Sequence, residues 1–219
     1  WSTMHILIAP DSFKESLSAA QVAEAIKLGF SKVYPHASYD LLPLGDGGEG
    51  TVESLTDALS LDVKHTYVTG PFGDKVKVTY AMKDDLAVFE MAAIVGLGSI
   101  PHEKRNPLLL KTEGIGELIV ELVQNGAQRI LIGVGGSASH EGGIGMASGL
   151  GVRFYDCDGD EVEAIGAHLG KIVRYSTDEM LVDLSQVRID LVTDVNNPLC
   201  GPLGATYVFA GQKGLAPEE

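Results

Sequence analysis

Several polar loops in this sequence combine carboxylates, hydroxyls, glycines and lysines in patterns that suit an anionic ligand. Asp11, Ser12 and Lys14 come directly after a short apolar run and shortly before a helix signal. A helix N-terminus near this loop would present backbone N–H groups and a positive dipole end to phosphate or carboxylate. Polar loops after strands also occur without ligands, so a solvated capping loop is the alternative interpretation.

A second loop places two acids among glycines. Asp46 and Glu49 stand within residues 45–50, together with Gly47 and Gly48. Carboxylate oxygens are preferred ligands of Mg²⁺, and glycine lets the backbone come close to a ligand. The loop is therefore a candidate site for a metal ion or for orienting a hydroxyl group. An ordinary glycine-rich turn is the alternative.

The glycine-rich run over residues 133–145 is the strongest candidate for a phosphate cradle. It contains Gly135, Gly136 and Ser137 and joins an apolar strand to a helix signal, so it offers several N–H donors to an anion. It is not a Walker A loop, because no Gly-Lys-Ser/Thr follows, and it fits the dinucleotide fingerprint poorly. Tight turns with close helix packing are the alternative. His140 is interpreted as a loop-tip residue rather than a catalyst.

Two further residues near the end of the chain could serve the same chemistry. Asp194 ends a strand beside Asn196 and Asn197, which is a suitable position for a general base or a metal ligand. An Asx-turn ahead of Pro198 is the alternative. Lys213 could neutralise a phosphate, although a surface lysine would normally be the favoured interpretation, and only the other loops make it a candidate. The histidines show no HExxH spacing, so metal-hydrolase chemistry has little support.

These loops must be positioned by alternating strands and helices. Apolar patterns predict strands over residues 5–9, 39–42, 86–91, 129–134, 152–155 and 187–192. Helices are expected after the capping-box spacing of Ser18 and Gln21, from about residue 52 to 59, and from 115 to 122. This alternation predicts an α/β fold with a mostly parallel sheet and flanking helices, whose ligands bind at the carboxyl ends of the strands. A β-hairpin excursion is expected near residues 63–82.

Composition excludes several classes of partner. The chain has 219 residues, of which 45% are apolar, and a net charge of −14, so we expect a substantial core and neither nucleic acid nor anionic membrane as partner. Cys157 and Cys200 suggest no disulfide framework or zinc site, which fits a reducing cytoplasm. No apolar stretch is long enough to span a bilayer, so a soluble protein is expected. Residues 1–3, ahead of Met4, are interpreted as a cloning scar.

Five segments together resemble the bacterial glycerate kinases. They are residues 8–19, 46–51, 105–108, 135–138 and 194–199, which read IAPDSFKESLSA, DGGEGT, RNPL, GGSA and DVNNPL. The resemblance runs in order from Met4 to the last residue. It implies a flavodoxin-like domain plus a second α/β domain, both incomplete here, so that residues 4–219 would be the N-terminal part of a two-domain chain.

The resemblance also implies a reaction and roles for the residues above. The family transfers the γ-phosphoryl group of ATP to D-glycerate with the help of Mg²⁺, giving 2- or 3-phosphoglycerate. From their positions in the loops, we assign catalytic roles to Asp194, Lys14 and Asp46, with Asp46 and Glu49 as metal ligands. Phosphate or substrate would be bound by Asp11, Ser12, Gly47, Gly48, Gly135, Gly136, Ser137, Asn197 and Lys213.

The sequence departs from the family pattern at Glu113, His140, Glu141 and Gly211. These changes predict an altered substrate or rate rather than an altered fold. Two alternatives stay open: a non-catalytic chain that binds phosphate or nucleotide, and a kinase for another small hydroxy acid. The oligomeric state and the hydroxyl that is phosphorylated, C2 or C3, are not indicated by the sequence.

Overall fold

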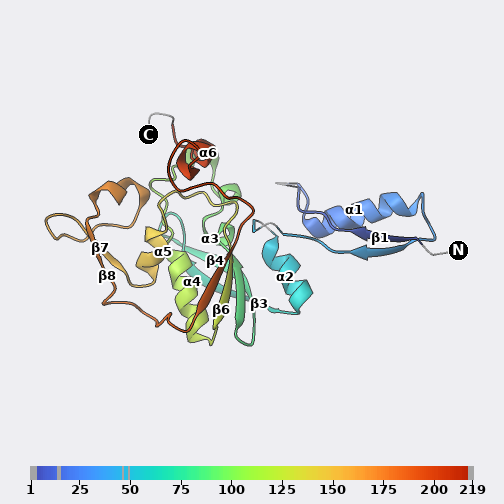
Figure 1. The fold of residues 1–219 in the computed structure, drawn as a ribbon, viewed down its shortest axis with the longest axis horizontal. Coiled ribbons are helices and arrows are strands. Elements are labelled where there is room, and N and C mark those ends of the chain that lie inside the picture. The colour runs from blue at the N-terminus through green and yellow to red at the C-terminus, as the bar shows by residue number, and fades with distance from the viewer. Residues whose placement is uncertain (1–3, 14–15, 46, 49, 217–219) are drawn as a thin grey trace.

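This computed structural model describes residues 4–13, 16–45, 47–48 and 50–216. These residues form an α/β fold with a central sheet and helices on both of its faces (Figure 1). The α/β prediction is confirmed. Within this part of the chain, no helix combines the length and the apolar character that crossing a membrane requires.

The N-terminal arm, residues 4–44, projects to one side of the rest of the molecule (Figure 1). Its strands β1 (His5–Ile8) and β2 (Ser38–Leu41) pair in parallel, and helix α1 (Ala19–Ser31) connects them. The predicted capping box is present: the N–H of Gln21 donates to Ser18 Oγ, and the N–H of Ser18 donates to Gln21 Oε1. This pair of bonds fixes where α1 begins.

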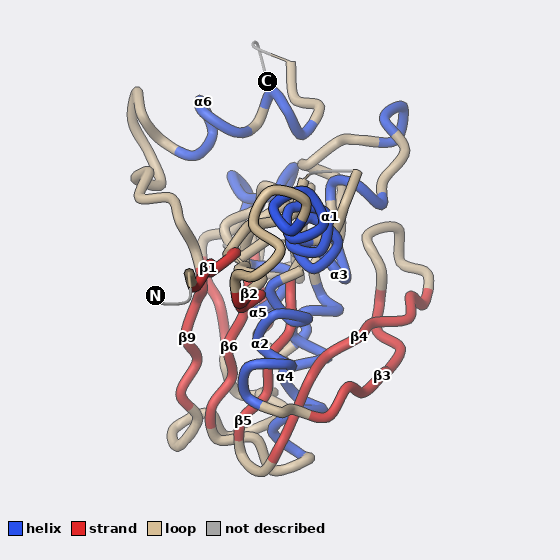
Figure 2. The backbone as a smooth tube through the Cα atoms, turned by 90° about the vertical axis from the view of Figure 1, so that its right-hand side faces the viewer, coloured by secondary structure: helices blue, strands red, loops and turns tan. Residues whose placement is uncertain are grey.

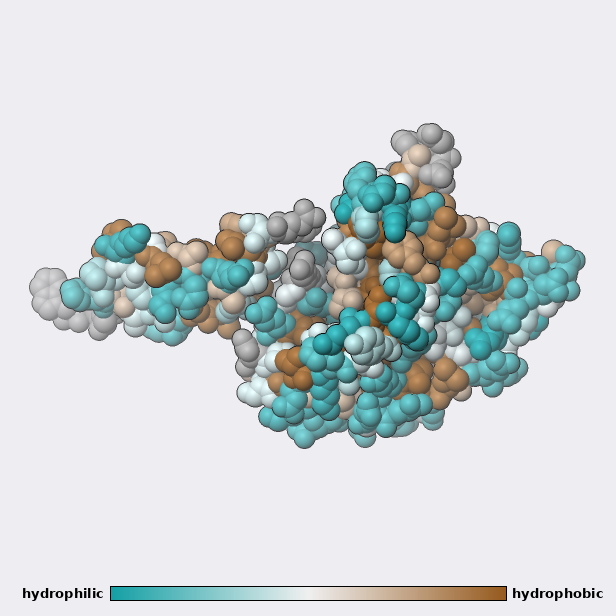
Figure 3. All heavy atoms as spheres, turned by 180° about the vertical axis from the view of Figure 1, so that it is seen from behind, coloured by the Kyte–Doolittle hydropathy of each residue, from teal (hydrophilic) through white to brown (hydrophobic). Residues whose placement is uncertain are grey.

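The apolar face of α1 is covered only near its N-terminal end. Val22 and Ala23 are buried, whereas Leu28 and Val33 are more than half exposed. The two strands beneath the helix have four residues each. Apolar surface is consequently visible on the arm (Figure 3).

The main sheet has five strands in the order β3-β4-β5-β6-β9, which lie side by side in Figure 2. Its strands are β3 (Asp62–Thr69), β4 (Lys75–Lys83), β5 (Leu86–Glu90), β6 (Arg129–Gly133) and β9 (Arg188–Val192). The pairs β5–β6 and β6–β9 are parallel, whereas β3 and β4 form an antiparallel hairpin that extends the sheet at one edge. The hairpin is thus continuous with the sheet.

Alternate side chains of this sheet face two different helices, as the period of a β-strand requires. Phe89 and Ile132 belong to the larger core, which is covered by helix α4 (Glu113–Gln124). Val88 and Leu131 face the opposite way and pack with helix α2 (Thr51–Leu59). The sheet is therefore buried between α4 and α2, which explains why its central strands are apolar throughout.

The remaining elements are short. They are α3 (Ala92–Val95), η1 (Leu97–Ser99), η2 (His102–Lys104), α5 (Ile144–Gly149), β7 (Arg153–Tyr155), η3 (Gly166–Lys171), β8 (Arg174–Ser176), α6 (Ala205–Phe209) and η4 (Gly211–Lys213). Strands β7 and β8 pair in an antiparallel ribbon with its own small apolar cluster. After β9 the chain rises to α6 (Figure 2), and this carries residues 205–213 over the end of the main sheet.

Candidate functional site

Three strands of the main sheet end in one row. Glu90 at the end of β5 lies opposite Gly133 at the end of β6, and Gly133 lies opposite Val192 at the end of β9. These strands are parallel, so their carboxyl ends share one edge of the sheet. Ligands of open α/β sheets bind at this edge. The loops that follow these strands are thereby brought together, as the sequence predicts.

The first glycine loop (residues 45–50) rests directly on the second glycine loop (residues 133–143). The N–H of Gly135 donates to the carbonyl oxygen of Gly47 at 2.9 Å. A Cβ atom on Gly133 would lie 2.6 Å from the same oxygen, and a Cβ on Gly135 would lie 2.8 Å from the Cα of Gly48. No side chain fits at these distances, so the glycines are required for the two backbones to meet.

The first glycine loop also contacts the end of β9. Gly47 has a φ of +96°, and a Cβ atom there would lie 2.2 Å from the carbonyl oxygen of Val192. The same position is 3.3 Å from the backbone nitrogen of Thr193. Asp194, the next residue, is exposed. The structure thus places the segment that carries Asp194 next to Gly47, 147 positions earlier in the chain.

Thr51 holds the first glycine loop closed, a role that sequence reasoning missed. Its Oγ1 accepts a hydrogen bond from the N–H of Gly47 at 3.0 Å and donates one to the carbonyl oxygen of Gly48 at 2.8 Å. The residue is only 2% exposed. The available signal was a hydroxyl residue directly after the glycines, at the first position of a helix.

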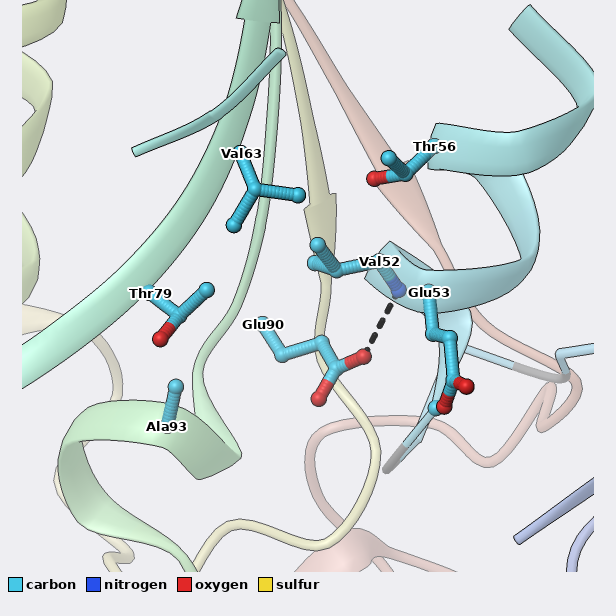
Figure 4. A pocket seen from close by; sticks show the side chains of 8 residues that line it. Val52, Glu53, Thr56, Val63, Thr79, Glu90 and Ala93 are labelled. Carbon is cyan, nitrogen blue, oxygen red and sulfur yellow. Dashed lines mark hydrogen bonds between the residues drawn. The ribbon is translucent and has the colours of Figure 1, made fainter. Parts of the chain in front are cut away.

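Glu90 is a second residue that sequence reasoning missed. It is 8% exposed, and its Oε1 accepts the N–H of Val52 at 2.8 Å (Figure 4). Val52 lies in the first turn of α2, where a negative charge is favoured by the helix dipole. The available signal was an acid that closes an otherwise apolar strand.

The second glycine loop keeps backbone donors available. Its neighbours hold it in place, because the N–H of Leu97 donates to the oxygen of Gly136 and the N–H of Ala138 donates to the oxygen of Val95, both at 2.8 Å. Among the described residues, no acceptor faces the N–H groups of Gly136 and Ser137. Gly136 is exposed and has a φ of +70°. Consecutive free N–H groups around such a residue can bind an anion.

Lys213 lies beside these donors. Its Nζ donates to the carbonyl oxygen of Ser139 at 2.7 Å and to Ser137 Oγ at 3.2 Å. Burial lowers the pKa of Lys213, and the nearby Glu141 carboxylate partly offsets this effect. The residue is therefore not a freely solvated surface lysine, and its ammonium group is held against the second glycine loop.

Helix α5, at the far end of the second glycine loop, already has an anion at its N-terminus. Glu141 is 5% exposed, and its two oxygens accept the N–H of Gly145 and the hydroxyl of Thr112, each at 3.0 Å. The protein's own carboxylate therefore occupies one of the donors that the sequence pattern suggested for phosphate. The N–H groups of Gly136 and Ser137, at the other end of the loop, are not occupied in this way by a described residue.

His140 connects the second glycine loop to α6. Its Nε2 lies 2.7 Å from Thr206 Oγ1. Burial lowers the pKa of His140, the positive charge of Lys213 lowers it further, and Glu141 opposes both. The contact ties the second glycine loop to α6.

The other predicted site residues are less closely gathered. Asp11 and Ser12 lie on the N-terminal arm, where the N–H of Ser12 donates to Asp11 Oδ1 at 2.6 Å. The N–H of Leu44 donates to the oxygen of Pro10 at 2.9 Å, which ties this loop to the chain that enters the first glycine loop. Asn197 donates from Nδ2 to the oxygen of Leu203 at 3.0 Å and so closes the turn after Asp194.

Lys14, Asp46 and Glu49 lie outside the described residues. The predicted metal site depends on Asp46 and Glu49, so it stays a prediction. In the part of the chain that the structure does describe, no group of three histidine, cysteine, aspartate or glutamate side chains is placed to hold a metal ion.

Comparison with known proteins relates the chain to one family. The model of the glycerate kinase family matches residues 6–219. A glycerate kinase from Neisseria meningitidis serogroup B is 52% identical over 212 residues, which are 97% of this chain and 57% of that protein. A glycerate 2-kinase from Escherichia coli K12 is 44% identical over 215 residues, which are 97% of this chain and 56% of that protein.

A solved structure agrees with this relationship. It is a crystal structure from Salmonella typhimurium LT2 of a protein proposed to be a glycerate kinase 2. The two chains have a TM-score of 0.82 and 44% sequence identity, and the match covers 99% of this chain and 59% of that one. The chain thus spans a little over half the length of the relatives it matches.

Proposed function

Because the chain belongs to the glycerate kinase family, we propose that it transfers the γ-phosphoryl group of ATP to D-glycerate. The observation that carries this proposal is the meeting of two glycine loops with the end of β9 at one edge of the sheet. Close backbone approach and free N–H groups are what a polyphosphate requires. The ammonium group of Lys213 adds positive charge at the same place.

The proposed binding roles follow from these positions. The N–H groups of Gly136 and Ser137, with Lys213, bind phosphate oxygens of ATP. Gly47, Gly48 and Gly135 let the two glycine loops pack together and so position these donors. Asp11, Ser12 and Lys14, on the loop after β1, bind the carboxylate or hydroxyl groups of glycerate from the side of the N-terminal arm.

Asp194 is the proposed general base. It is exposed at the end of β9, next to the first glycine loop, so an incoming hydroxyl group can reach it. Asn197 fixes the turn that follows and orients this carboxylate or the substrate. In phosphoryl transfer the base contributes modestly, typically about 10²–10⁴-fold, because positioning and electrostatics do most of the catalysis.

Mg²⁺ is part of the proposal. A bound ion would supply positive charge against the charge that develops on the transferring phosphoryl group. Asp46 and Glu49 are the proposed ligands, and Asp194 is a further carboxylate near the same loop. The net charge of −14 does not oppose such a site, because N–H groups, Lys213 and the ion supply local positive potential.

The proposal also includes the hydroxyl group that is phosphorylated and the compartment in which the reaction takes place. The E. coli relative is a glycerate 2-kinase, which favours the C2 hydroxyl as acceptor and 2-phosphoglycerate as product. We also place the reaction in the cytoplasm, which the free and exposed Cys157 and Cys200 support, because disulfides are rare in reducing compartments.

The product identifies the reaction. The protein is incubated with ATP, Mg²⁺ and D-glycerate, and the phosphorylated acid is identified by ³¹P NMR, with L-glycerate and other hydroxy acids as parallel substrates. We expect 2-phosphoglycerate from D-glycerate. Turnover with another acid alone would identify a different small-acid kinase. ATP binding without any phosphorylated product would identify a non-catalytic binder.

The role of Asp194 has its own test. The Asp194→Asn variant should fold normally and lose about 10²–10⁴-fold in kcat with little change in the KM for ATP. Asn196→Ala, at an exposed neighbouring position, is the matched control for disturbance of the turn. Undiminished kcat in a folded Asp194→Asn protein would exclude this residue as the base.

A further inference from the structure

A groove of about 400 Å³ lies between α2 and the main sheet, beside the first glycine loop. Its volume is within the range of small-molecule sites in proteins. Side chains from four separated segments line it, and Figure 4 shows them around a common space. The lining consists of Gly50, Val52, Glu53, Thr56, Val63, Thr79, Glu90 and Ala93.

The groove has apolar walls and polar corners. Val52 on α2 and Val63 on β3 face each other across it, with Ala93 of α3 at one end (Figure 4). Two carboxylates, Glu53 and Glu90, border the same space. Flat apolar groups with hydrogen-bond donors at their edges fit such a lining.

The two carboxylates of the groove distinguish between the ligand groups that the proposed reaction requires. Glycerate carries a carboxylate and ATP carries a triphosphate, and both would be repelled by Glu53 and Glu90. The nucleoside end of ATP is uncharged. Its exocyclic amine and ribose hydroxyls are donors that carboxylates accept, as in dinucleotide sites where an acid binds the ribose. Among these groups, only the nucleoside complements the groove.

Thr56 adds an independent observation. Its Oγ1 is buried and has no hydrogen-bond partner among the described residues. In Figure 4 this oxygen points from α2 toward the interior of the groove. A buried hydroxyl without a partner is destabilising, and native proteins usually satisfy such groups or use them. A ligand in the groove would supply the missing partner.

The groove is continuous with the proposed phosphate site. Gly50 borders the groove and closes the first glycine loop, whose Gly47 accepts the N–H of Gly135. Glu90 lies opposite Gly133, where the second glycine loop begins. A nucleotide with its base in the groove would therefore direct its phosphates toward the N–H groups of Gly136 and Ser137.

We propose that this groove is the nucleoside subsite, which binds the adenine and ribose of ATP while the glycine loops bind its phosphates. The inference rests on the proposed function and extends it to the specificity for the phosphoryl donor. Val52 and Val63 enclose the base, and the carboxylates and Thr56 accept or donate hydrogen bonds at its edges.

Filling the groove tests the proposal. Val63 is 54% exposed, so Val63→Trp should fold while its side chain occupies the space of the base. Tyr67→Trp, farther along β3 at a position 65% exposed and outside the groove, is the matched control. Dissociation constants for ATP and for inorganic tripolyphosphate are measured by calorimetry on each protein.

We expect Val63→Trp to raise the Kd for ATP by about tenfold or more, the equivalent of one lost stacking contact, and to leave that for tripolyphosphate unchanged. Tyr67→Trp should change neither constant. An unchanged Kd for ATP in Val63→Trp, with wild-type protein that binds ATP, would overturn the nucleoside subsite alone. Wild-type protein that binds neither ATP nor tripolyphosphate would overturn the proposed function and this inference with it.

A second variant distinguishes ligand binding from packing. Thr56→Val replaces the partnerless hydroxyl by a methyl group of the same shape, so the free energy of unfolding should rise or stay the same. If the hydroxyl contacts the nucleoside, the same variant weakens ATP binding about three- to tenfold and leaves tripolyphosphate binding intact. A merely structural threonine would leave both dissociation constants unchanged, and that result would contradict the proposed contact.

Discussion

Replacing Gly47 by alanine tests whether the two glycine loops and β9 meet as described. Gly47 has a φ of +96°, so the variant first incurs the cost of left-handed backbone, about 1–2 kcal/mol. The new Cβ would also lie 2.2 Å from the carbonyl oxygen of Val192, which is much shorter than an ordinary van der Waals contact. The loop must then move, and the bond from Gly135 to Gly47, worth about 1 kcal/mol, is strained or lost.

Gly126 is a matched control, because it has the same φ of +96° but nothing within 4 Å of its Cβ position. Gly126→Ala therefore reports the backbone cost alone, about 1–2 kcal/mol. For Gly47→Ala we expect a loss of about 3–5 kcal/mol, in the range of overpacked sites, or a smaller loss with a displaced loop. In both cases turnover should fall for Gly47→Ala and not for Gly126→Ala.

The assay is urea unfolding of the wild type and both variants, with the slope m compared to check that the unfolded surface is unchanged. ADP formation is measured on the same preparations. If Gly47→Ala lost no more stability than Gly126→Ala and kept full activity, the described contact between the first glycine loop and β9 would be refuted.

Three further predictions concern the same region and its support. Thr51→Val should lower the free energy of unfolding by about 1–3 kcal/mol in urea melts, because two loop contacts lose their partner, whereas Thr51→Ser should cost less. Lys213→Met should raise the KM for ATP by more than any loss of folded protein explains. Equal KM values for variant and wild type would contradict the proposed contact between Lys213 and phosphate. Burial raises the pKa of Glu117, but hydrogen bonds from Thr69 and the charge of Lys75 outweigh it and hold the pKa below its ordinary value. The carboxylate therefore contributes stability above about pH 4.5 that is lost as pH falls further, so Glu117→Gln should flatten the acid limb of a stability profile.

The strand pattern was sufficient to predict where the loops would gather. The apolar runs around Val88, Ile132 and Leu191 are β5, β6 and β9, and their parallel pairing brings the loops after them to one edge. This inference needs only the period of the elements and the rule for parallel sheets. For the same reason the α/β class could be predicted without knowing any contact.

Contacts that satisfy buried groups could not be predicted in the same way. The hydroxyl of Thr51 accepts the N–H of Gly47 in the loop, and the carboxylate of Glu90 accepts the N–H of Val52 in the first turn of α2. Only the folded chain shows which donors need a partner. Lys213 meets Ser139 across 74 positions of sequence, so local spacing says nothing about it. The resemblance to a family, not the pattern, made it a candidate.

The sequence also did not show how much of the apolar face of α1 is buried. Helix α1 begins at its predicted capping box, but its buried residues, Ala19, Val22 and Ala23, all lie in its first turns. Periodicity shows which face of a helix is apolar, but the partner determines how much of that face is buried.

We propose that these loops form a site for phosphoryl transfer from ATP to D-glycerate. The most direct test is the rate of Mg²⁺-dependent ADP formation with and without D-glycerate, on protein shown to be folded. We expect D-glycerate to stimulate ADP formation, and Lys213→Met and Asp194→Asn to reduce this stimulation. ADP formation that is absent, or unaffected by D-glycerate, in folded wild-type protein would contradict it.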